Sequence, residues 1–127
     1  GIDRAAASLA RARAAAGGAA TLQLVQADLE QWPLPQGRFD VVLNFRYLQR
    51  SLAPAIVAAL RPGGALVFET FLVEQLQLGH PRNPEFVLRH NELLHLFRDL
   101  RVLHYEEGLF RDGDGEAHLA RLLATRE

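Results

Sequence analysis

The spacing of apolar and polar positions changes several times along the chain, and the changes predict a mixed α/β fold. Ala5–Ala16 is dominated by the best helix former and stops at Gly17-Gly18, which predicts one helix. Short continuous apolar runs at Leu22–Gln26 and Phe39–Leu43 predict strands, the second of them a buried core strand. Prolines within Trp32–Gly37 exclude regular structure there, so a loop joins these strands.

The next segments continue the alternation of strand and helix. Ser51–Leu60 predicts a helix, in which Pro54 is tolerated because it falls in the first turn. The helix stops before Arg61-Pro62-Gly63-Gly64, and Ala65–Phe71 returns as a strand. Strands that alternate with helices across short breaks are typical of parallel βαβ units whose sheet is covered on both faces.

The carboxyl-terminal part of the chain has a different pattern. Val73–Arg89 is polar and too long for a simple connection, so we expect a lid or a substrate loop. Asn91–Phe97 predicts a short helix. Leu100–Tyr105 and Ala117–Thr125 predict two strands joined by the turn Asp112-Gly113-Asp114-Gly115, an antiparallel pair that closes one edge of the sheet.

Composition narrows the class of protein. A chain of 127 residues that is 49% apolar predicts a single domain, residues 1–127, with one modest core. The net charge of −1, with both signs dispersed, gives no attraction to nucleic acid. No apolar run approaches the roughly 18 to 20 residues of a membrane span and no signal peptide is evident, so we expect a cytoplasmic protein without a membrane partner.

Metal and thiol chemistry receive no support from the sequence. The absence of cysteine excludes disulfides, thiolate metal sites and a cysteine nucleophile. The five histidines show no paired ligand spacing, and His90 and His95, five residues apart, point to different sides of a helix. We therefore expect no metal site.

The start of the sequence suggests that part of the fold lies upstream. The chain contains no methionine, and it opens on Gly1-Ile2-Asp3 as though in the middle of a strand. We interpret the sequence as a domain truncated at its amino end. The upstream residues are expected to contain an apolar strand and a Gly-x-Gly-type turn.

Three short segments, in this order and at this spacing, resemble class I S-adenosylmethionine-dependent methyltransferases from their second strand onward. They are Gly1-Ile2-Asp3, Gln26-Ala27-Asp28-Leu29, and Phe39–Asn44 followed by Leu60-Arg61-Pro62-Gly63-Gly64. The resemblance implies a Rossmann-like sheet, mostly parallel with an antiparallel closing hairpin, that lacks its first strand and helix in this chain. The glycine-rich cofactor loop of the family belongs to that missing part.

The same resemblance implies where S-adenosylmethionine would bind. Asp3 corresponds to the acidic residue that accepts hydrogen bonds from both ribose hydroxyls, although it could instead cap the following helix. Asp28 corresponds to the acceptor for the adenine amino group, with Ala27 and Leu29 beside the ring, although an aspartate before such a loop could also be a loop cap. Asn44 and Phe45 stand where donor and acceptor would meet.

A narrower resemblance, to the tellurite-resistance-type methyltransferases, rests on Phe45–Arg50, Glu69-Thr70-Phe71, Gly79–Phe86 and Asn91–Leu94. It implies a small-molecule or soft-anion acceptor. The residues implied for its pocket are Arg46, Tyr47, Arg50 and Arg82, and if a catalytic base is used, His80 is the first candidate and Glu69 the second. An ordinary solvated loop explains His80 and Arg82 equally well.

Two other functions remain open at this point. One is the nicotinamide-dinucleotide-binding domain of an oxidoreductase, in which Asp3 would also bind ribose. The other is a non-catalytic α/β interaction module. In the order of strands that the resemblance implies, the missing strand lies between the strand ending at Ile2 and Phe39–Leu43. Its absence would leave open strand edges, which predicts aggregation or pairing with a second copy as a homo-oligomer.

Overall fold

A computed structural model describes residues 1–18, 21–113 and 115–127 of the chain. The described residues form two compact units, Gly1–Leu34 and Pro35–Glu127, called here unit 1 and unit 2. The sheets are also separate, because a two-stranded sheet belongs to unit 1 and a four-stranded sheet to unit 2. Each unit is described by itself.

Unit 1 contains a parallel strand pair and one helix. Its elements are β1 (Ile2–Asp3), α1 (Ala6–Ala15) and β2 (Val25–Gln26). Strand β1 pairs with β2 in parallel, with Ile2 opposite Val25 and Asp3 opposite Gln26. The expected helix is confirmed within one residue at each end, whereas the expected strand Leu22–Gln26 is confined to its last two residues. No described residue of unit 1 is buried, so this unit has no core of its own.

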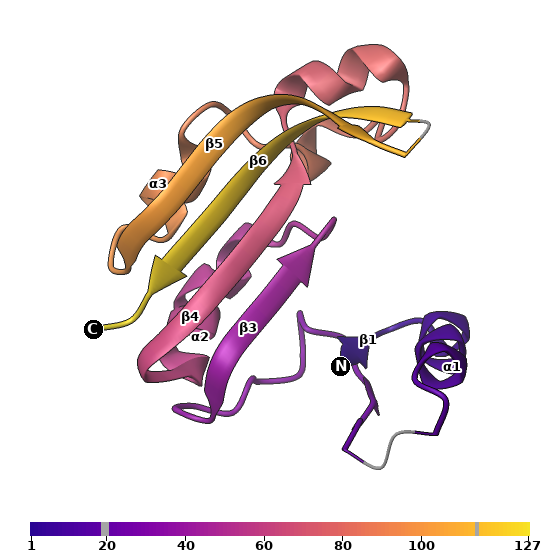
Figure 1. Cartoon of the computed structure of the whole chain (residues 1–127), viewed down its shortest axis with the longest axis vertical. Helices are drawn as coiled ribbons and strands as arrows, with labels where there is room; N and C mark the ends of the chain where they lie inside the picture. Colours follow the sequence, from indigo (N-terminus) through magenta and orange to yellow (C-terminus); the bar gives the residue numbers. More distant parts are fainter. Residues whose placement is uncertain (19–20, 114) are drawn as a thin grey trace. The chain divides into compact units, whose positions relative to one another are not determined.

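Unit 2 begins with a βαβ arrangement and ends in a long hairpin. Its elements are β3 (Phe39–Phe45), η1 (Arg50–Leu52), α2 (Ala53–Ala59), β4 (Leu60–Phe71), η2 (Val73–Leu78), η3 (Pro84–Phe86), α3 (Glu92–Leu96), β5 (Arg101–Asp112) and β6 (Gly115–Thr125), where η denotes a 3-10 helix. The strand order is β3-β4-β6-β5 (Figure 1). Strands β3 and β4 are parallel, and β6 runs antiparallel to both of its neighbours.

The carboxyl-terminal hairpin confirms the antiparallel pair expected from the sequence, with longer strands. The expected Leu100–Tyr105 is extended to Asp112 because eleven residue pairs bind it to β6 from Arg101 to Asp112. Strand β6 lies between β4 and β5, so β5 forms the edge (Figure 1). Of the predicted turn, Asp114 lies outside the described residues.

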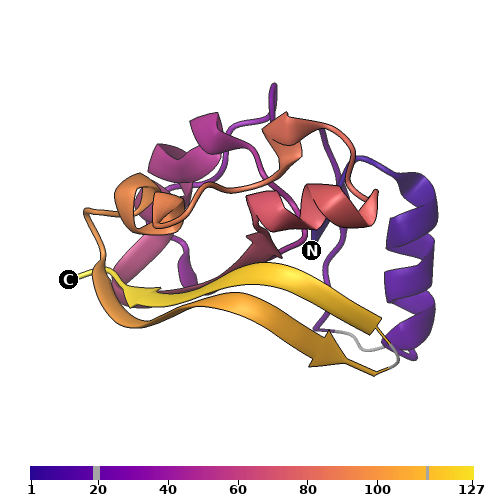
Figure 2. The same ribbon diagram turned by 90° about the horizontal axis from the view of Figure 1, so that it is seen from above.

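One face of the four-stranded sheet carries the core. Leu66, Phe68 and Thr70 of β4 are buried on this face, where the Phe68 ring lies 5.4 Å from that of Phe97 between centroids. Ile56 of α2 is also buried. Figure 2 shows α2, η2 and α3 on the same side of the sheet. The helices of unit 2 therefore cover a single face.

Strand β3 differs from the expectation of a buried core strand. Val41, Leu43 and Phe45 are 52%, 63% and 53% exposed, and Phe39 is also exposed. The reason is topological, because β3 is the edge strand of its sheet and these side chains alternate onto the face opposite the helices of unit 2. The exposed side chains of β3 therefore form an apolar row on the face of the sheet that the helices of unit 2 do not cover.

Two further boundaries were misplaced by the sequence analysis. The helix predicted at Ser51–Leu60 is split into the 3-10 turn η1 and the shorter α2, which has Pro54 in its first turn as expected. The strand predicted at Ala65–Phe71 begins at Leu60, because Leu60 pairs with Phe39 before an irregularity in the register. The polar segment Val73–Arg89 contains two 3-10 helices, η2 and η3.

Candidate functional site

In unit 1, two carboxylates follow the ends of neighbouring parallel strands. Asp3 is the last residue of β1, and Asp28 comes two residues after β2. The amide of Ala27 donates to the carbonyl of Asp3 over 3.1 Å, which continues the strand pairing to the residue next to Asp28. The carboxyl ends of parallel strands are where α/β sheets bind ligands.

Each of these carboxylates has one oxygen in a local turn. Oδ1 of Asp3 accepts from the amide of Ala5 over 2.8 Å, and Oδ1 of Asp28 accepts from the amide of Glu30 over 3.0 Å. Ala5 is itself the N-cap of α1, so Asp3 orients the residue before the helix and does not cap the helix directly. Among the described residues no further hydrogen bond reaches either carboxylate, which leaves Oδ2 of both for a ligand.

The turn after Asp28 holds the neighbouring candidate residues. The amides of Gln31 and Trp32 both donate to the carbonyl of Asp28, over 3.0 and 2.7 Å. Ala27 and Leu29 are half-buried beside this turn, and Trp32 is exposed. These residues offer a small apolar surface next to an acidic hydrogen-bond acceptor.

In unit 2, the end of β3 forms a sharply turned corner. The side-chain amide of Asn44 donates to the carbonyl of Tyr47 over 2.7 Å and closes the corner. Arg46 has a φ of 57°, in the left-handed region that favours glycine. Its amide donates to the carbonyl of Glu69 over 2.8 Å, which ties the corner to β4. Asn44 is thus committed to the corner, whereas Phe45 is exposed.

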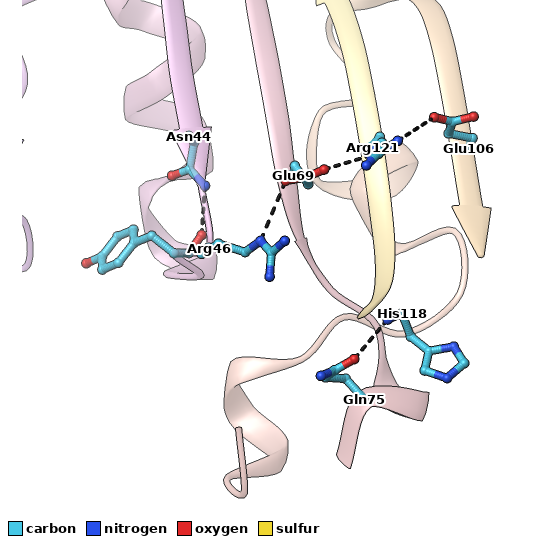
Figure 3. A network of polar contacts seen from close by, with 8 residues as sticks. Asn44, Arg46, Glu69, Gln75, Glu106, His118 and Arg121 are labelled. Atoms are coloured by element: carbon cyan, nitrogen blue, oxygen red, sulfur yellow. Dashed lines mark hydrogen bonds and ion pairs between the residues drawn. The ribbon is translucent and has the colours of Figure 1, made fainter. Parts of the chain in front are cut away.

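A chain of charged side chains crosses the open face of the sheet from this corner (Figure 3). Nε of Arg46 lies 3.6 Å from Oε2 of Glu69, and Nε of Arg121 donates to Oε1 of the same carboxylate over 2.7 Å. Arg121 also reaches Glu106 on β5, at 3.5 Å. Because two guanidinium groups flank Glu69, this carboxylate is better suited to anchoring them than to removing a proton.

Phe71, the last residue of β4, brings Arg46 and His80 to one ring. The guanidinium carbon of Arg46 lies 4.6 Å from the ring centroid, and the imidazole of His80 meets the ring edge at 6.4 Å between centroids. Buried Gln75 holds His80 in place, since its Nε2 donates to the carbonyl of His80. Figure 3 shows the other contact of the same side chain, in which Oε1 of Gln75 accepts from the amide of His118. The fold therefore brings Arg46, a predicted pocket residue, and His80, the first candidate for a base, to the same aromatic ring.

Phe71, Gln75 and Arg121 were not predicted as site residues. Phe71 ends an apolar strand, so its sequence context predicts a core residue. Nothing in the local sequence distinguishes Gln75 from the other polar residues of its loop. Arg121 interrupts the apolar run of β6, which was the only available signal. Its role becomes visible only when β6 pairs with β4, which places Arg121 opposite Glu69.

Arg50, also predicted to line the pocket, is fully engaged by the protein. Its Nε and Nη2 donate to both carboxylate oxygens of Glu92, and Nη1 and Nη2 donate to the carbonyls of Glu85 and Val87, each over 2.8 Å. These contacts fasten the segment around η3 and the first residue of α3 to η1, the 3-10 helix that precedes α2. Tyr47 donates from its hydroxyl to Gln49, and Arg82 is exposed.

Replacing Arg50 with alanine is expected to lower the free energy of unfolding by about 2 kcal/mol at neutral pH, because several charge-assisted hydrogen bonds are lost from a side chain that is partly exposed. The hydrogen bond from Arg50 is the main cause that lowers the pKa of Glu92 below its ordinary 4.5. The pair therefore stabilises the fold above pH 4.5, and this contribution disappears as the pH falls through the lower pKa of the folded state.

Urea denaturation of the wild type and Arg50→Ala at several pH values below and above 4.5 tests this expectation. The difference between the two proteins should shrink as the pH falls. Arg101→Ala is a suitable control, because its ion pair with Glu127 is exposed and 3.7 Å long. A difference that stays constant down to the acid transition would show that the Arg50–Glu92 pair has no such role.

No group of three or more histidine, aspartate and glutamate side chains is placed to hold a metal ion within the ranges that the structure describes. None of the helices in these ranges is long and apolar enough to cross a membrane. The candidate residues predicted from the sequence fall into two groups. Those of unit 1 include the carboxylates Asp3 and Asp28, and those of unit 2 are mainly cationic and aromatic side chains.

Comparison with protein families gives one match. The model described as "Methyltransferase domain" matches residues 1–64, half of the chain, and includes both carboxylates of unit 1 and the whole of β3. No curated protein sequence matches the chain.

Solved structures with the same fold are numerous. TehB from Haemophilus influenzae is 17% identical with a TM-score of 0.74, and the match covers 99% of this chain and 49% of TehB. An S-adenosylmethionine-dependent methyltransferase from Mesorhizobium loti is 23% identical with a TM-score of 0.77, at 99% and 79% coverage. The N-methyltransferase NodS from Bradyrhizobium japonicum WM9, solved with S-adenosyl-l-homocysteine, is 20% identical with a TM-score of 0.72, at 99% and 65%. The chain spans about half the length of TehB.

Proposed function

Because the chain belongs to the methyltransferase domain family, we propose that it carries out methyl transfer from S-adenosylmethionine to a small-molecule acceptor. The fold shared with S-adenosylmethionine-dependent methyltransferases supports this function and disfavours the nicotinamide-dinucleotide alternative. We propose that the protein acts in the cytoplasm. The observation that carries the proposal is the pair of carboxylates, Asp3 and Asp28, at adjacent strand ends with one oxygen of each uncommitted.

The carboxylates fit the polar groups of the cofactor. An ionised carboxylate only accepts hydrogen bonds, so Oδ2 of Asp3 suits a ribose diol and Oδ2 of Asp28 suits the adenine amino group. The local turns at Ala5 and Glu30 fix the orientation of both side chains through Oδ1, which lowers the cost of ordering them on binding. Ala27 and Leu29 would contact the ring.

The acceptor is proposed to bind at the carboxyl ends of β3 and β4, where Arg46 and His80 both contact Phe71, with Asn44 and Phe45 at the point where donor and acceptor would meet. S-adenosylmethionine, held by Asp3 and Asp28, would supply an electrophilic methyl group on a sulfonium. The protein then needs mainly to align the reactants and exclude water. His80 could receive the proton of a protonated acceptor, while an anionic acceptor would need no base.

We further propose that the methyl acceptor is a soft anion. The narrower resemblance of the sequence to tellurite-resistance-type methyltransferases supports this assignment. Tyr47 and Arg82 remain candidates for contacts with the acceptor. The guanidinium of Arg50 already donates to Glu92, Glu85 and Val87. We therefore propose that Arg50 holds this part of the fold together and does not bind the acceptor itself.

In the full-length protein, replacing Asp3 with alanine is expected to weaken binding of S-adenosylhomocysteine by about 1.5 to 3 kcal/mol, roughly ten- to hundredfold, because hydrogen bonds to a charged group are lost. Isothermal titration calorimetry measures this change directly. Asp40→Ala provides the matched control, since Asp40 is an exposed carboxylate whose ion pair with Arg61 is 3.1 Å long. If Asp3→Ala folds normally and binds with unchanged affinity, Asp3 serves only to orient Ala5 before the helix.

A further inference from the structure

Three arginines lie near the carboxyl ends of β3 and β4 or on the open face beside them, and they differ in how far the protein uses their donors. Arg50 is bound by one carboxylate and two carbonyls. Arg121 is bound by Glu69 and Glu106 and stacks on Phe110 at 3.9 Å. Arg46 forms an ion pair with Glu69 through Nε, at 3.6 Å. Within the part of the chain that the structure describes, no hydrogen bond engages its two terminal nitrogens.

Although its terminal nitrogens are uncommitted, Arg46 is held in a defined pose. Its amide is tied to the carbonyl of Glu69, and its guanidinium lies over the Phe71 ring at 4.6 Å. Its backbone occupies the left-handed region at φ 57°, which costs a non-glycine residue about 1 to 2 kcal/mol. A glycine would adopt this corner at no such cost, so the presence of arginine indicates that its side chain has a use.

The use indicated by this geometry is the binding of an anion. A guanidinium whose Nε side is anchored still presents a fork of donors that matches the two oxygens of a carboxylate or a similar oxyanion. The Arg46 side chain is 38% exposed, so a ligand can reach the fork. His80, at the edge of the same Phe71 ring, adds an imidazole that can donate a further hydrogen bond.

We infer that the methyl acceptor carries, apart from the soft atom that takes the methyl group, a planar oxyanion such as a carboxylate, and that this oxyanion is bound by the terminal nitrogens of Arg46 beside His80 on the Phe71 ring. This inference rests on the proposed methyl transfer, because it assigns the ligand to the acceptor. The chemistry alone would also fit the amino-acid carboxylate of the cofactor. The experiment must therefore distinguish the two sources.

Equilibrium dialysis of the full-length protein, with sodium benzoate as the probe and benzamide as its neutral counterpart, tests the site. Benzoate is expected to bind at least tenfold more tightly than benzamide. Arg46→Gln and Arg46→Gly should each weaken benzoate binding at least tenfold and leave benzamide binding unchanged. The glycine variant keeps the left-handed corner accessible, so it guards against loss of the fold. Arg101→Gln, at the first residue of β5, removes an exposed arginine elsewhere and should have no effect.

Two arms decide the source of the oxyanion. With saturating S-adenosylhomocysteine, benzoate should still bind, and calorimetry should give the same affinity for S-adenosylhomocysteine in Arg46→Gln as in the wild type. If S-adenosylhomocysteine displaced benzoate, or if Arg46→Gln bound S-adenosylhomocysteine more weakly than the wild type, Arg46 would be assigned to the cofactor. Either result would overturn the inference. Equal binding of benzoate and benzamide, or full binding by both Arg46 variants, would also overturn it. Failure of the wild type to bind S-adenosylhomocysteine would instead count against the proposed methyl transfer.

Discussion

The polypeptide of residues 1–127 is expected to associate in solution through β3, and Leu43→Lys is expected to convert the associated species to monomer. Strand β3 pairs on one side with β4 and is the edge of its sheet. Its outward residues Val41, Leu43 and Phe45 form an exposed apolar row. An edge strand of this kind offers both unpaired backbone groups and apolar surface to a second copy, and a lysine on it opposes such pairing.

Sedimentation velocity over a range of concentrations measures this effect. Leu109→Lys is the matched control, because Leu109 is a comparably exposed leucine, 52%, on the opposite edge strand β5. It should leave the association unchanged. A wild-type polypeptide that stays monomeric at all concentrations and unfolds cooperatively would contradict pairing through β3. It would also count against the homo-oligomer proposed from the sequence.

Gly64→Ala is expected to destabilise unit 2 by about 2 to 3 kcal/mol, the upper part of the range of about 1 to 3 kcal/mol for forcing an extra carbon into a packed site. A Cβ at position 64 would lie 2.9 Å from the carbonyl oxygen of Arg61, 3.0 Å from that of Phe39 and 3.2 Å from that of Asp40. All three contacts are with backbone, which cannot move aside without disturbing the start of the β3–β4 pairing. The strain should therefore appear as lost stability of the whole sheet.

Urea denaturation followed by circular dichroism provides the measurement. Gly108→Ala, in the middle of β5, is the control, because no heavy atom lies within 4 Å of the position of its added Cβ. That variant should be neutral or slightly more stable, since alanine restricts the unfolded chain. If Gly64→Ala matched Gly108→Ala in stability, the close approach of the two strands at Gly64 would not be essential.

The order of elements and the family could be predicted from the sequence because both depend on local patterns. A helix in Ala5–Ala16 follows from alanine content and a glycine stop, and the hairpin follows from two apolar runs around a glycine-rich turn. The positions of Asp3 and Asp28 at strand ends are equally local, since each carboxylate comes at or just after an apolar run. Short-range chemistry decides all of these features.

The tertiary structure decided which residues are exposed to solvent and which arginine hydrogen-bond donors are already occupied by other groups of the protein. Strand β3 has the composition of a core strand, but its exposure depends on its place at the sheet edge, which no residue of the strand encodes. Arg46 and Arg50 are four residues apart and alike in sequence context. Only the fold brings Glu92 to Arg50 and leaves Arg46 over Phe71 with its terminal nitrogens uncommitted, because these partners lie more than twenty residues away along the chain.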